Sequence, residues 1–289
     1  NPRVSQSVDQ NYMAFLIAAR AFREHGANHV TAVLPYLAYA RQDKPTMFMR
    51  EPTTASLMAD LAVEAGIDRL ITWHPHSRQI HGFYGGIPLD VLTPLTLFIE
   101  AYQRFQGRDD VIVVAPDVGA SKFVTYMGRA LGVRSAIASK YRPSPEEAVI
   151  SEIIGDFSNK RVAIVLDDMI SGGGTVEATV KRLAEDNKIE DVYVGVSHNL
   201  CMDSARERLM DLHENYNLKE LLVTDSIPQT QAFRELPFIV VKSLSEILAR
   251  MVNRIHYSQS VSELFTRALS SLDKTSLGAP ARLNSKKEA

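Results

Sequence analysis

Continuous apolar segments alternate with segments of helical periodicity along most of this chain. Apolar runs typical of strands that are buried on both faces occur at residues 29–35, 68–73, 111–116, 134–139, 161–168, 191–198, 218–228 and 238–243. Apolar residues at helical spacing occur at 8–26, 52–66, 93–106, 118–132, 175–187, 203–214 and 244–256. Because strands that alternate with helices form right-handed β-α-β units, the pattern predicts an α/β fold with mainly parallel sheets flanked by helices.

The number of these units is too large for one compact sheet. We therefore expect two α/β domains, at residues 1–92 and 93–260, followed by a C-terminal tail at 261–289. The end of this tail is rich in Ser, Lys and Ala and has weak periodicity, which is typical of a mobile segment. Packing of the tail on the N-terminal domain is compatible with its sequence.

The charge and the cysteine content exclude several classes of function. The 289 residues carry a formal net charge of -2, so the chain is not built to coat nucleic acid or an anionic membrane, and we expect neither as a partner. No segment of the sequence approaches the roughly 20 apolar residues of a membrane-spanning helix. Cys201 is the one cysteine and can form no disulfide within the chain, which favours a reducing, cytoplasmic location.

The strongest local signal for a binding site lies between Val165 and Thr175. An apolar strand ends in two acids, and a Ser-Gly-Gly-Gly-Thr turn opens the next helix. Glycines allow several backbone N–H groups to point inward, and the helix adds the positive end of its dipole, so this turn can cradle an anion of monophosphate size. The acids can accept hydrogen bonds from sugar hydroxyls or hold a cation shared with the ligand. The candidate binding residues are Asp167, Asp168, Ser171, Gly172, Gly173, Gly174 and Thr175.

A simpler interpretation of the same sequence is a flexible turn with solvated acids. The turn is not a Walker loop, because no Lys follows the glycines, and it lacks the G-x-G-x-x-G pattern of dinucleotide-binding loops. The strand, the acid pair, the glycines and the helix occur together, however, and this combination favours a phosphate site.

This loop resembles the phosphoribosyl-pyrophosphate-binding loop of type I phosphoribosyltransferases. Further segments narrow the resemblance to the ribose-phosphate pyrophosphokinases, also called phosphoribosyl pyrophosphate synthetases; they are residues 34–44, 79–84, 114–119 and 224–228, in family order and at family-like spacing. Ordinary phosphoribosyltransferases share only the loop, so Tyr-Ala-Arg-Gln-Asp at residues 39–43 is the discriminating piece. The resemblance covers residues 8–260 and implies two phosphoribosyltransferase-like domains and a homo-oligomer.

The resemblance also assigns candidate residues for ATP and magnesium. From spacing alone, residues 41–43 would be a surface turn and His74 and His76 a pair of loop histidines. The ATP-binding residues of the family match Arg41, Gln42, Asp43 and His76, and its magnesium ligands match His76 and Asp117. Asp117 also occupies a position that suits a helix cap. His74 stands where the family has an Asp, which removes an acidic contribution to cation binding, and Asp90 matches another acid of the family.

A polar segment at residues 140–149, with two prolines and charges of both signs, predicts a loop. By themselves, Lys140 and Arg142 are solvated charges. The family carries a mobile loop here whose basic residues close over the transferring group, so the resemblance makes Lys140 and Arg142 the catalytic candidates. It also places residues 224–228 near the ribose phosphate, with Asp225 and Ser226 as secondary candidates.

The reaction that the resemblance implies is transfer of a pyrophosphoryl group from ATP, with Mg²⁺ as cofactor, to the anomeric hydroxyl of ribose 5-phosphate, with AMP leaving. Two features depart from the family: Ser171 replaces an Asp found in many relatives, and the family's first strands are absent before the helix near residue 8. Two other functions stay open. One is a non-catalytic regulatory relative that keeps the fold, and the other is a phosphoribosyltransferase that consumes phosphoribosyl pyrophosphate with a nucleobase.

Overall fold

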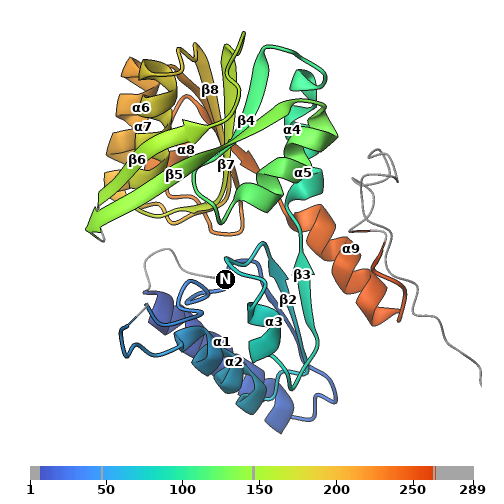
Figure 1. Cartoon of the computed structure of the whole chain (residues 1–289). Coiled ribbons are helices and arrows are strands. Elements are labelled where there is room, and N and C mark those ends of the chain that lie inside the picture. The colour runs from blue at the N-terminus through green and yellow to red at the C-terminus, as the bar shows by residue number, and fades with distance from the viewer. Residues whose placement is uncertain (1–6, 47, 145–146, 263, 265–289) are drawn as a thin grey trace, which may run out of the picture.

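In its described residues, the chain forms two β-sheets with helices packed on them (Figure 1). The computed structural model describes residues 7–46, 48–144, 147–262 and 264, and of residues 140–144 and 147–149 it describes the backbone alone. In this part of the chain, the N-terminal sheet has the order β1-β2-β3 and the C-terminal sheet has the order β10-β9-β8-β7-β4-β5-β6. Neighbouring strands are parallel, except that β5 and β6 pair antiparallel.

The strands of the N-terminal sheet are β1 (Thr31–Leu34), β2 (Arg69–Trp73) and β3 (Leu89–Leu92). Those of the C-terminal sheet are β4 (Val111–Ala115), β5 (Arg134–Ser144), β6 (Glu147–Ile154), β7 (Val162–Ile170), β8 (Asp191–Asn199), β9 (Leu218–Thr224) and β10 (Ile239–Lys242). The helices are α1 (Val8–Glu24), α2 (Thr54–Glu64), α3 (Ile80–Phe83), α4 (Leu95–Tyr102), η1 (Gln103–Phe105), α5 (Ser121–Leu131), α6 (Gly174–Glu185), α7 (Asp203–Asn215), α8 (Gln231–Arg234) and α9 (Ser245–His256).

Helices α1 and α2 pack on one face of the N-terminal sheet. A capping box fixes the start of α1, because the Ser7 side chain accepts from the backbone N–H of Gln10 and the Gln10 side chain accepts from the N–H of Ser7. Tyr12 and Leu16, four residues apart, then face the core together with Leu70 of β2. The buried face of α2 consists of alanines, which allow the helix to approach the sheet closely.

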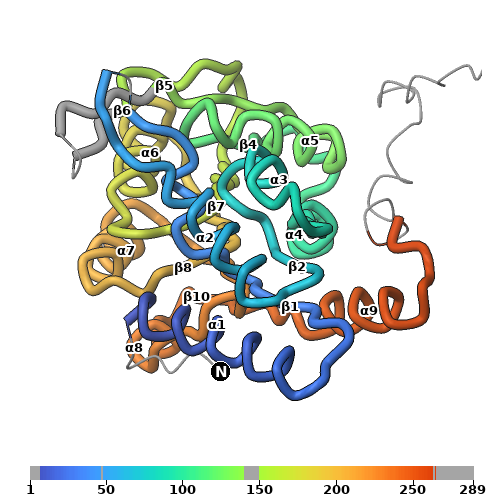
Figure 2. The backbone as a smooth tube through the Cα atoms, turned by 90° about the horizontal axis from the view of Figure 1, so that it is seen from below, coloured from blue at the N-terminus to red at the C-terminus, as the bar shows by residue number. Residues whose placement is uncertain are grey.

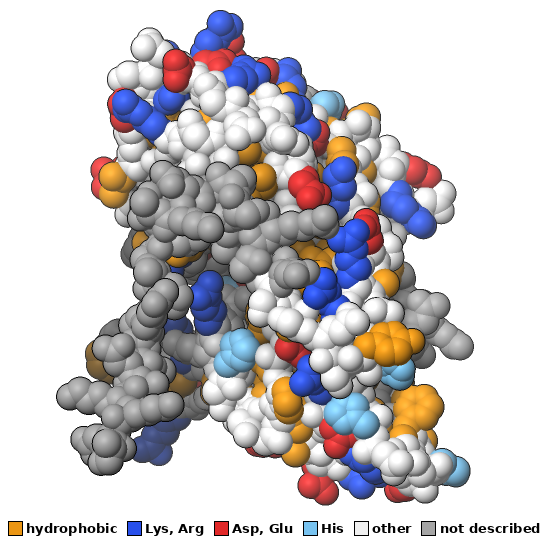
Figure 3. Space-filling model, turned by 90° about the vertical axis from the view of Figure 1, so that its right-hand side faces the viewer, with side chains coloured by type: hydrophobic (Ala, Val, Ile, Leu, Met, Phe, Trp, Pro, Cys, Tyr) orange, Lys and Arg blue, Asp and Glu red, His pale blue; other side chains and the backbone are white. Residues whose placement is uncertain are grey.

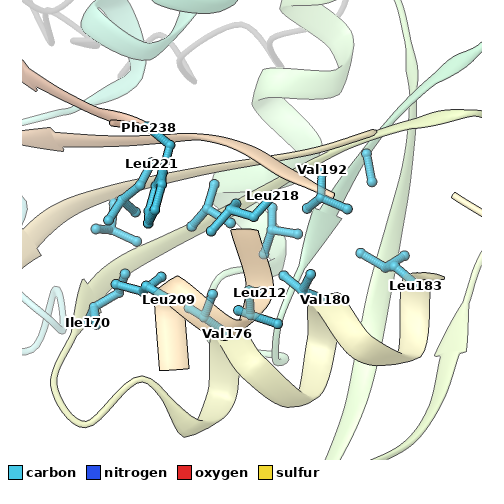
Figure 4. Packing of buried hydrophobic residues seen from close by; sticks show 14 of the residues in the cluster. Ile170, Val176, Val180, Leu183, Val192, Leu209, Leu212, Leu218, Leu221 and Phe238 are labelled. Carbon is cyan, nitrogen blue, oxygen red and sulfur yellow. The ribbon is translucent and has the colours of Figure 1, made fainter. Parts of the chain in front are cut away.

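The C-terminal sheet is covered on both faces, which explains why its strands are apolar along their length. Side chains that alternate along β4 enter different clusters: Ile112 packs with α6 and α7, whereas Val111 and Val113 pack with α4 and α5. Figure 4 shows the first cluster, with Val176 and Val180 of α6 facing the strands. Full burial of one such aliphatic side chain contributes roughly 1.5–3 kcal/mol, so these two layers account for much of the stability.

Helix α9 returns from the C-terminal sheet to the N-terminal one. It follows β10 and lies beside the N-terminal sheet (Figures 1 and 2), where Leu244 and Met251 pack against Ile71 and Trp73 of β2 and Leu92 of β3. The start of the helix is fixed by the carboxylate of Asp225, which accepts from the N–H of Leu244 (2.7 Å) and from the hydroxyl of Ser243 (2.6 Å). The N-terminal sheet is therefore covered on its second face by a C-terminal element.

The predicted α/β fold with mainly parallel sheets is confirmed, and each predicted strand and helix has a counterpart. Two strands were not predicted, β3 and β6. The loop predicted at 140–149 is wrong as secondary structure, because β5 continues to Ser144 and forms a hairpin with β6. Beyond Ile137, β5 pairs only with the edge strand β6, and edge positions tolerate the prolines and charges that indicated a loop.

The division into domains at 92/93 falls between β3 and α4 and stays a prediction. Of the predicted tail at 261–289, Val261 and Leu264 pack with α9 on the Trp73 cluster, and residues 263 and 265–289 lie outside the described residues. Lys and Arg side chains are interspersed with acids over the face in Figure 3, in keeping with the small net charge. Among the described helices, none combines the length and the apolar character needed to cross a bilayer.

Candidate functional site

The candidate acids lie at the carboxyl ends of neighbouring parallel strands. Strand β4 pairs with β7, and β7 pairs with β8, so Asp117, two residues after β4, lies near the acid pair of β7. The sequence predicted that the acid pair ends its strand, but β7 continues to Ile170. The carboxyl edge of a parallel α/β sheet is the usual place for a ligand.

Asp167 and Asp168 are adjacent acids that interact with each other. The backbone N–H of Asp168 donates to Oδ1 of Asp167 at 2.9 Å. Burial, together with the nearby charges of Asp168 and Asp117, raises the pKa of Asp167 well above its ordinary value. A bound cation would favour the ionised form of these three carboxyl groups.

The glycine-rich turn leads from β7 into α6. Gly173 is the N-cap residue of α6 and has a φ of +81°, a left-handed conformation that suits glycine. A Cβ atom at Gly173 would also lie 3.2 Å from Cα of Ala205. Since glycine has no side chain with which to cap the first amides of α6, these N–H groups are suited to binding an anion.

Helix α7 contacts the glycine-rich turn. The guanidinium of Arg208 donates to the carbonyl oxygen of Gly172 and pairs through Nε with Glu177 of α6 at 2.9 Å. This contact could not be predicted from the sequence, because Arg208 lies 36 residues from Gly172 on an amphipathic helix. The turn is thus held by α6 and α7 together.

His76 connects the end of β2 to the acid pair of β7. Its Nδ1 donates to Oδ2 of Asp168 at 2.6 Å. This hydrogen bond raises the pKa of His76. Burial would raise the pKa of Asp168, but the hydrogen bond and the charge of His76 outweigh burial and lower it. Each residue therefore favours the charged form of the other across the two sheets.

The segment at residues 41–43 lies close to this pair. The charges of Arg41 and Asp43 both act on the imidazole of His76, and the carbonyl oxygen of Gln42 accepts from the N–H of Ala55 at the start of α2 (3.1 Å). Arg41 and Gln42 are exposed and Asp43 is buried. The structure thus brings the predicted ATP-binding residues next to the predicted ribose-phosphate site.

His74 lies between the sheets. Its Nδ1 is 2.6 Å from Oγ of Ser197, and its carbonyl oxygen accepts from Nε2 of His198 at 3.1 Å. Burial, with a smaller effect of His198, lowers the pKa of His74 to about 3, so the ring is neutral at pH 7. Ser197 and His198 were missed by the sequence analysis, although polar residues at the end of an apolar strand are a usable signal.

Three other candidates have different surroundings. Asp90 is in β3 and pairs with Arg69 at 3.2 Å, and Asp225 fixes the start of α9. Ser226 is hydrogen-bonded to His198, with its Oγ 2.8 Å from Nδ1 of that residue, and so belongs to the same group of polar contacts as His74. The backbones of Lys140 and Arg142 lie in β5, and their side chains lie outside the described part of the structure.

The described residues contain no group of three or more His, Cys, Asp or Glu side chains with the geometry of a metal site. Mg²⁺ differs from Zn²⁺ in that it keeps several waters and takes one or two carboxylates together with substrate phosphates. The carboxylate oxygens of Asp117 fit such an ion. His76 fits its outer shell, since its nitrogen is a poor magnesium ligand.

Comparison with known proteins was consistent across sequence and structure. The family described as the N-terminal domain of ribose phosphate pyrophosphokinase matches residues 2–66, and the phosphoribosyl synthetase-associated domain matches residues 131–266. The ribose-phosphate pyrophosphokinase of Fusobacterium nucleatum is 36% identical over 263 residues, which are 90% of this chain and 80% of the relative. That of Caldanaerobacter subterraneus is 36% identical over 259 residues, 90% of this chain and 79% of the relative.

A solved structure gives the same result. The phosphoribosylpyrophosphate synthetase of Mycobacterium smegmatis has a TM-score of 0.77 and 32% identity to this chain. The match covers 87% of this chain and 79% of the other.

Proposed function

Because the chain belongs to the ribose-phosphate pyrophosphokinase family, we propose that it transfers a pyrophosphoryl group from ATP to the anomeric hydroxyl of ribose 5-phosphate. The products are phosphoribosyl pyrophosphate and AMP. The observation that carries the proposal is the hydrogen bond between His76 and Asp168, because it puts the candidate sites for the two substrates side by side. In-line transfer between two substrates needs this proximity.

Ribose 5-phosphate is assigned to the edge of β7 and the start of α6. The amides of the turn would bind the 5-phosphate, with hydrogen bonds from the hydroxyls of Ser171 and Thr175. Asp167 and Asp168 would accept from the ribose hydroxyls. The left-handed conformation of Gly173 and the support of Gly172 by Arg208 favour this assignment, since both fix the shape of the turn. Gly174, the first residue of α6, is also assigned to this phosphate site.

ATP is assigned to Arg41, Gln42, Asp43 and His76. Arg41 is exposed and carries a guanidinium that can bind phosphate oxygens bidentately. The ionised form of His76, which Asp168 favours, would add a second positive charge beside the transferring group. Mg²⁺ would be held by Asp117 and the phosphates of ATP, with His76 in its outer shell. When bound, the ion neutralises charge on the β- and γ-phosphates.

Lys140 and Arg142 are assigned to charge stabilisation in the transition state. Both lie in β5 beyond the last residue that pairs with β4, where the strand is bonded only to β6. We also propose that the protein forms a homo-oligomer, on the basis of the family resemblance alone.

One assay separates this function from its rivals. With ribose 5-phosphate, ATP and Mg²⁺, we expect AMP and phosphoribosyl pyrophosphate to form in equal amounts, measured by chromatography. Binding of both substrates without turnover would instead support a regulatory protein, a function that the replacement of the family Asp by His74 favours. Release of pyrophosphate that requires a nucleobase and no ATP would support a phosphoribosyltransferase.

A further inference from the structure

The side chain of His74 connects β2 to the C-terminal sheet. Its Nδ1 is 2.6 Å from Oγ of Ser197, a fully buried residue of β8. Ser197 is itself held, because its carbonyl oxygen accepts from the hydroxyls of Thr224 (2.5 Å) and Ser226 (3.0 Å) at the end of β9. His74 is therefore anchored to two neighbouring strands of the other sheet.

The backbone of His74 is held as well. Its N–H donates to the carbonyl oxygen of Leu92 at 3.0 Å, and its carbonyl oxygen accepts from Nε2 of His198 at 3.1 Å. The φ of His74 is +41°, a conformation that is uncommon outside glycine, although Asn, Asp and His adopt it more often than other residues do. Such strain persists where surrounding contacts determine the backbone, and it is concentrated at functional sites. The ring also packs on Phe123, with centroids 5.3 Å apart.

Two residues further on, His76 contacts Asp168 of β7. Strands β7 and β8 are neighbours, with Asp167 opposite Val196, so His74 and His76 hold the segment 74–76 against adjacent strands. We propose that His74 is a positioning residue, whose hydrogen bond with Ser197 fixes this segment and so places His76 against Asp168 and toward the nucleotide. Its effect on turnover rests on the function proposed above.

Variants at His74 can separate the hydrogen bond from the backbone conformation. His74→Gly permits the positive φ but has no side chain. His74→Asn also tolerates this φ and carries a polar atom on Cγ, in the position of Nδ1. Ser197→Ala removes the partner. His213→Asn is the matched control, since the Nδ1 of His213 is hydrogen-bonded to the carbonyl oxygen of Leu218 at the amino end of β9, away from the candidate site at the carboxyl ends of the strands.

The expected result is a split between kcat and KM. His74→Gly and Ser197→Ala should each lower kcat about tenfold, with KM for ribose 5-phosphate within about twofold of wild type. The double variant should be no worse than either single one, because both remove the same interaction. His74→Asn should restore most of kcat, and His213→Asn should leave it unchanged.

The inference is overturned if His74→Gly keeps the wild-type kcat, or if the two single effects multiply in the double variant. A crystal structure of His74→Gly gives a test that does not depend on turnover. The inference requires the distance from His76 Nδ1 to Asp168 Oδ2 to exceed about 3.2 Å. If the wild type makes no AMP while this distance lengthens, the proposed function fails and the positioning role stands; an unchanged distance rejects the positioning role.

Discussion

Oδ2 of Asp168 lies 2.6 Å from Nδ1 of His76, so a carboxylate of the proposed ribose-phosphate site and an imidazole of the proposed nucleotide site share one hydrogen bond. The two residues are 92 positions apart and come from different sheets. Each is expected to contact a different substrate. Substitution of one should therefore affect the binding of both substrates, to different extents.

Replacement of Asp168 by Ala should abolish detectable binding of ribose 5-phosphate. Two hydrogen bonds from ribose hydroxyls to an ionised carboxylate contribute roughly 3 kcal/mol or more. Titration calorimetry at pH 7 measures the effect. Asp186→Ala is the control, because Asp186 is an exposed residue at the end of α6 that pairs with Arg182. Binding unchanged by Asp168→Ala would remove Asp168 from the site.

The pair of His76 and Asp168 should stabilise the protein most between about pH 4 and 6.5. The pKa of Asp168 is lowered on folding, so its contribution is present above the unfolded value of 3.8 and is lost as the pH falls through the folded pKa. The pKa of His76 is raised, so its contribution is complete below 6.5 and is lost as the pH rises through the folded pKa.

The measurement is the difference in free energy of unfolding between wild type and His76→Gln, by urea denaturation in metal-free buffer. Because the His76 side chain is 39% exposed, solvent screening should limit the difference to about 1 kcal/mol at its maximum. A difference that stays constant from pH 3 to pH 9 (roughly the range in which Asp and His titrate) would show that the two residues are not ionised together.

Gly173→Ala should destabilise the protein by about 1–3 kcal/mol and weaken ribose 5-phosphate binding, because the left-handed φ and the close contact with Ala205 both oppose a Cβ atom. Gly172→Ala is a matched control for stability. A Cβ atom there would meet Arg208 and Ser204 at 3.6 Å, an ordinary contact. Equal free energies of unfolding for the two variants would contradict the expected strain at Gly173.

Lys140→Ala should lower kcat by about 10²-fold or more with little change in ATP affinity, if the ammonium group acts mainly in the transition state. Steady-state kinetics and equilibrium binding of ATP measure the two quantities separately. Lys219→Ala is the control, since Lys219 pairs with Asp191 at the amino ends of β9 and β8. A loss of ATP affinity without a loss of kcat would assign Lys140 to nucleotide binding instead.

The architecture was predictable because the buried strands are apolar and the helices are amphipathic. Strand β3 was not predicted because it has four residues and Asp90 interrupts its apolar run. Strand β6 was not predicted because its first residue, Glu147, lies within the polar, proline-containing segment at residues 140–149. Both errors arise where local composition disagrees with the pairing that the whole fold provides.

The proposed site could be recognised from the sequence where its residues are consecutive. The acids and glycines at residues 167–175 form one sequence motif, and the structure keeps them together. The contact of His74 with Ser197 joins residues 123 positions apart, and that of Arg208 with Gly172 joins residues 36 apart. Such contacts depend on how strands and helices pack, and hydrophobic periodicity carries no information about them.

The return of α9 to the N-terminal sheet makes the chain cross between the two sheets twice, between β3 and α4 and again between β10 and α9. A single crossing would act as a hinge, about which the sheets could swing apart in many directions. Two crossings define an axis, and relative motion is restricted to a twist about it. Substrates would then enter and products leave by a rotation of small amplitude about this axis, during which α9 stays packed on the N-terminal sheet.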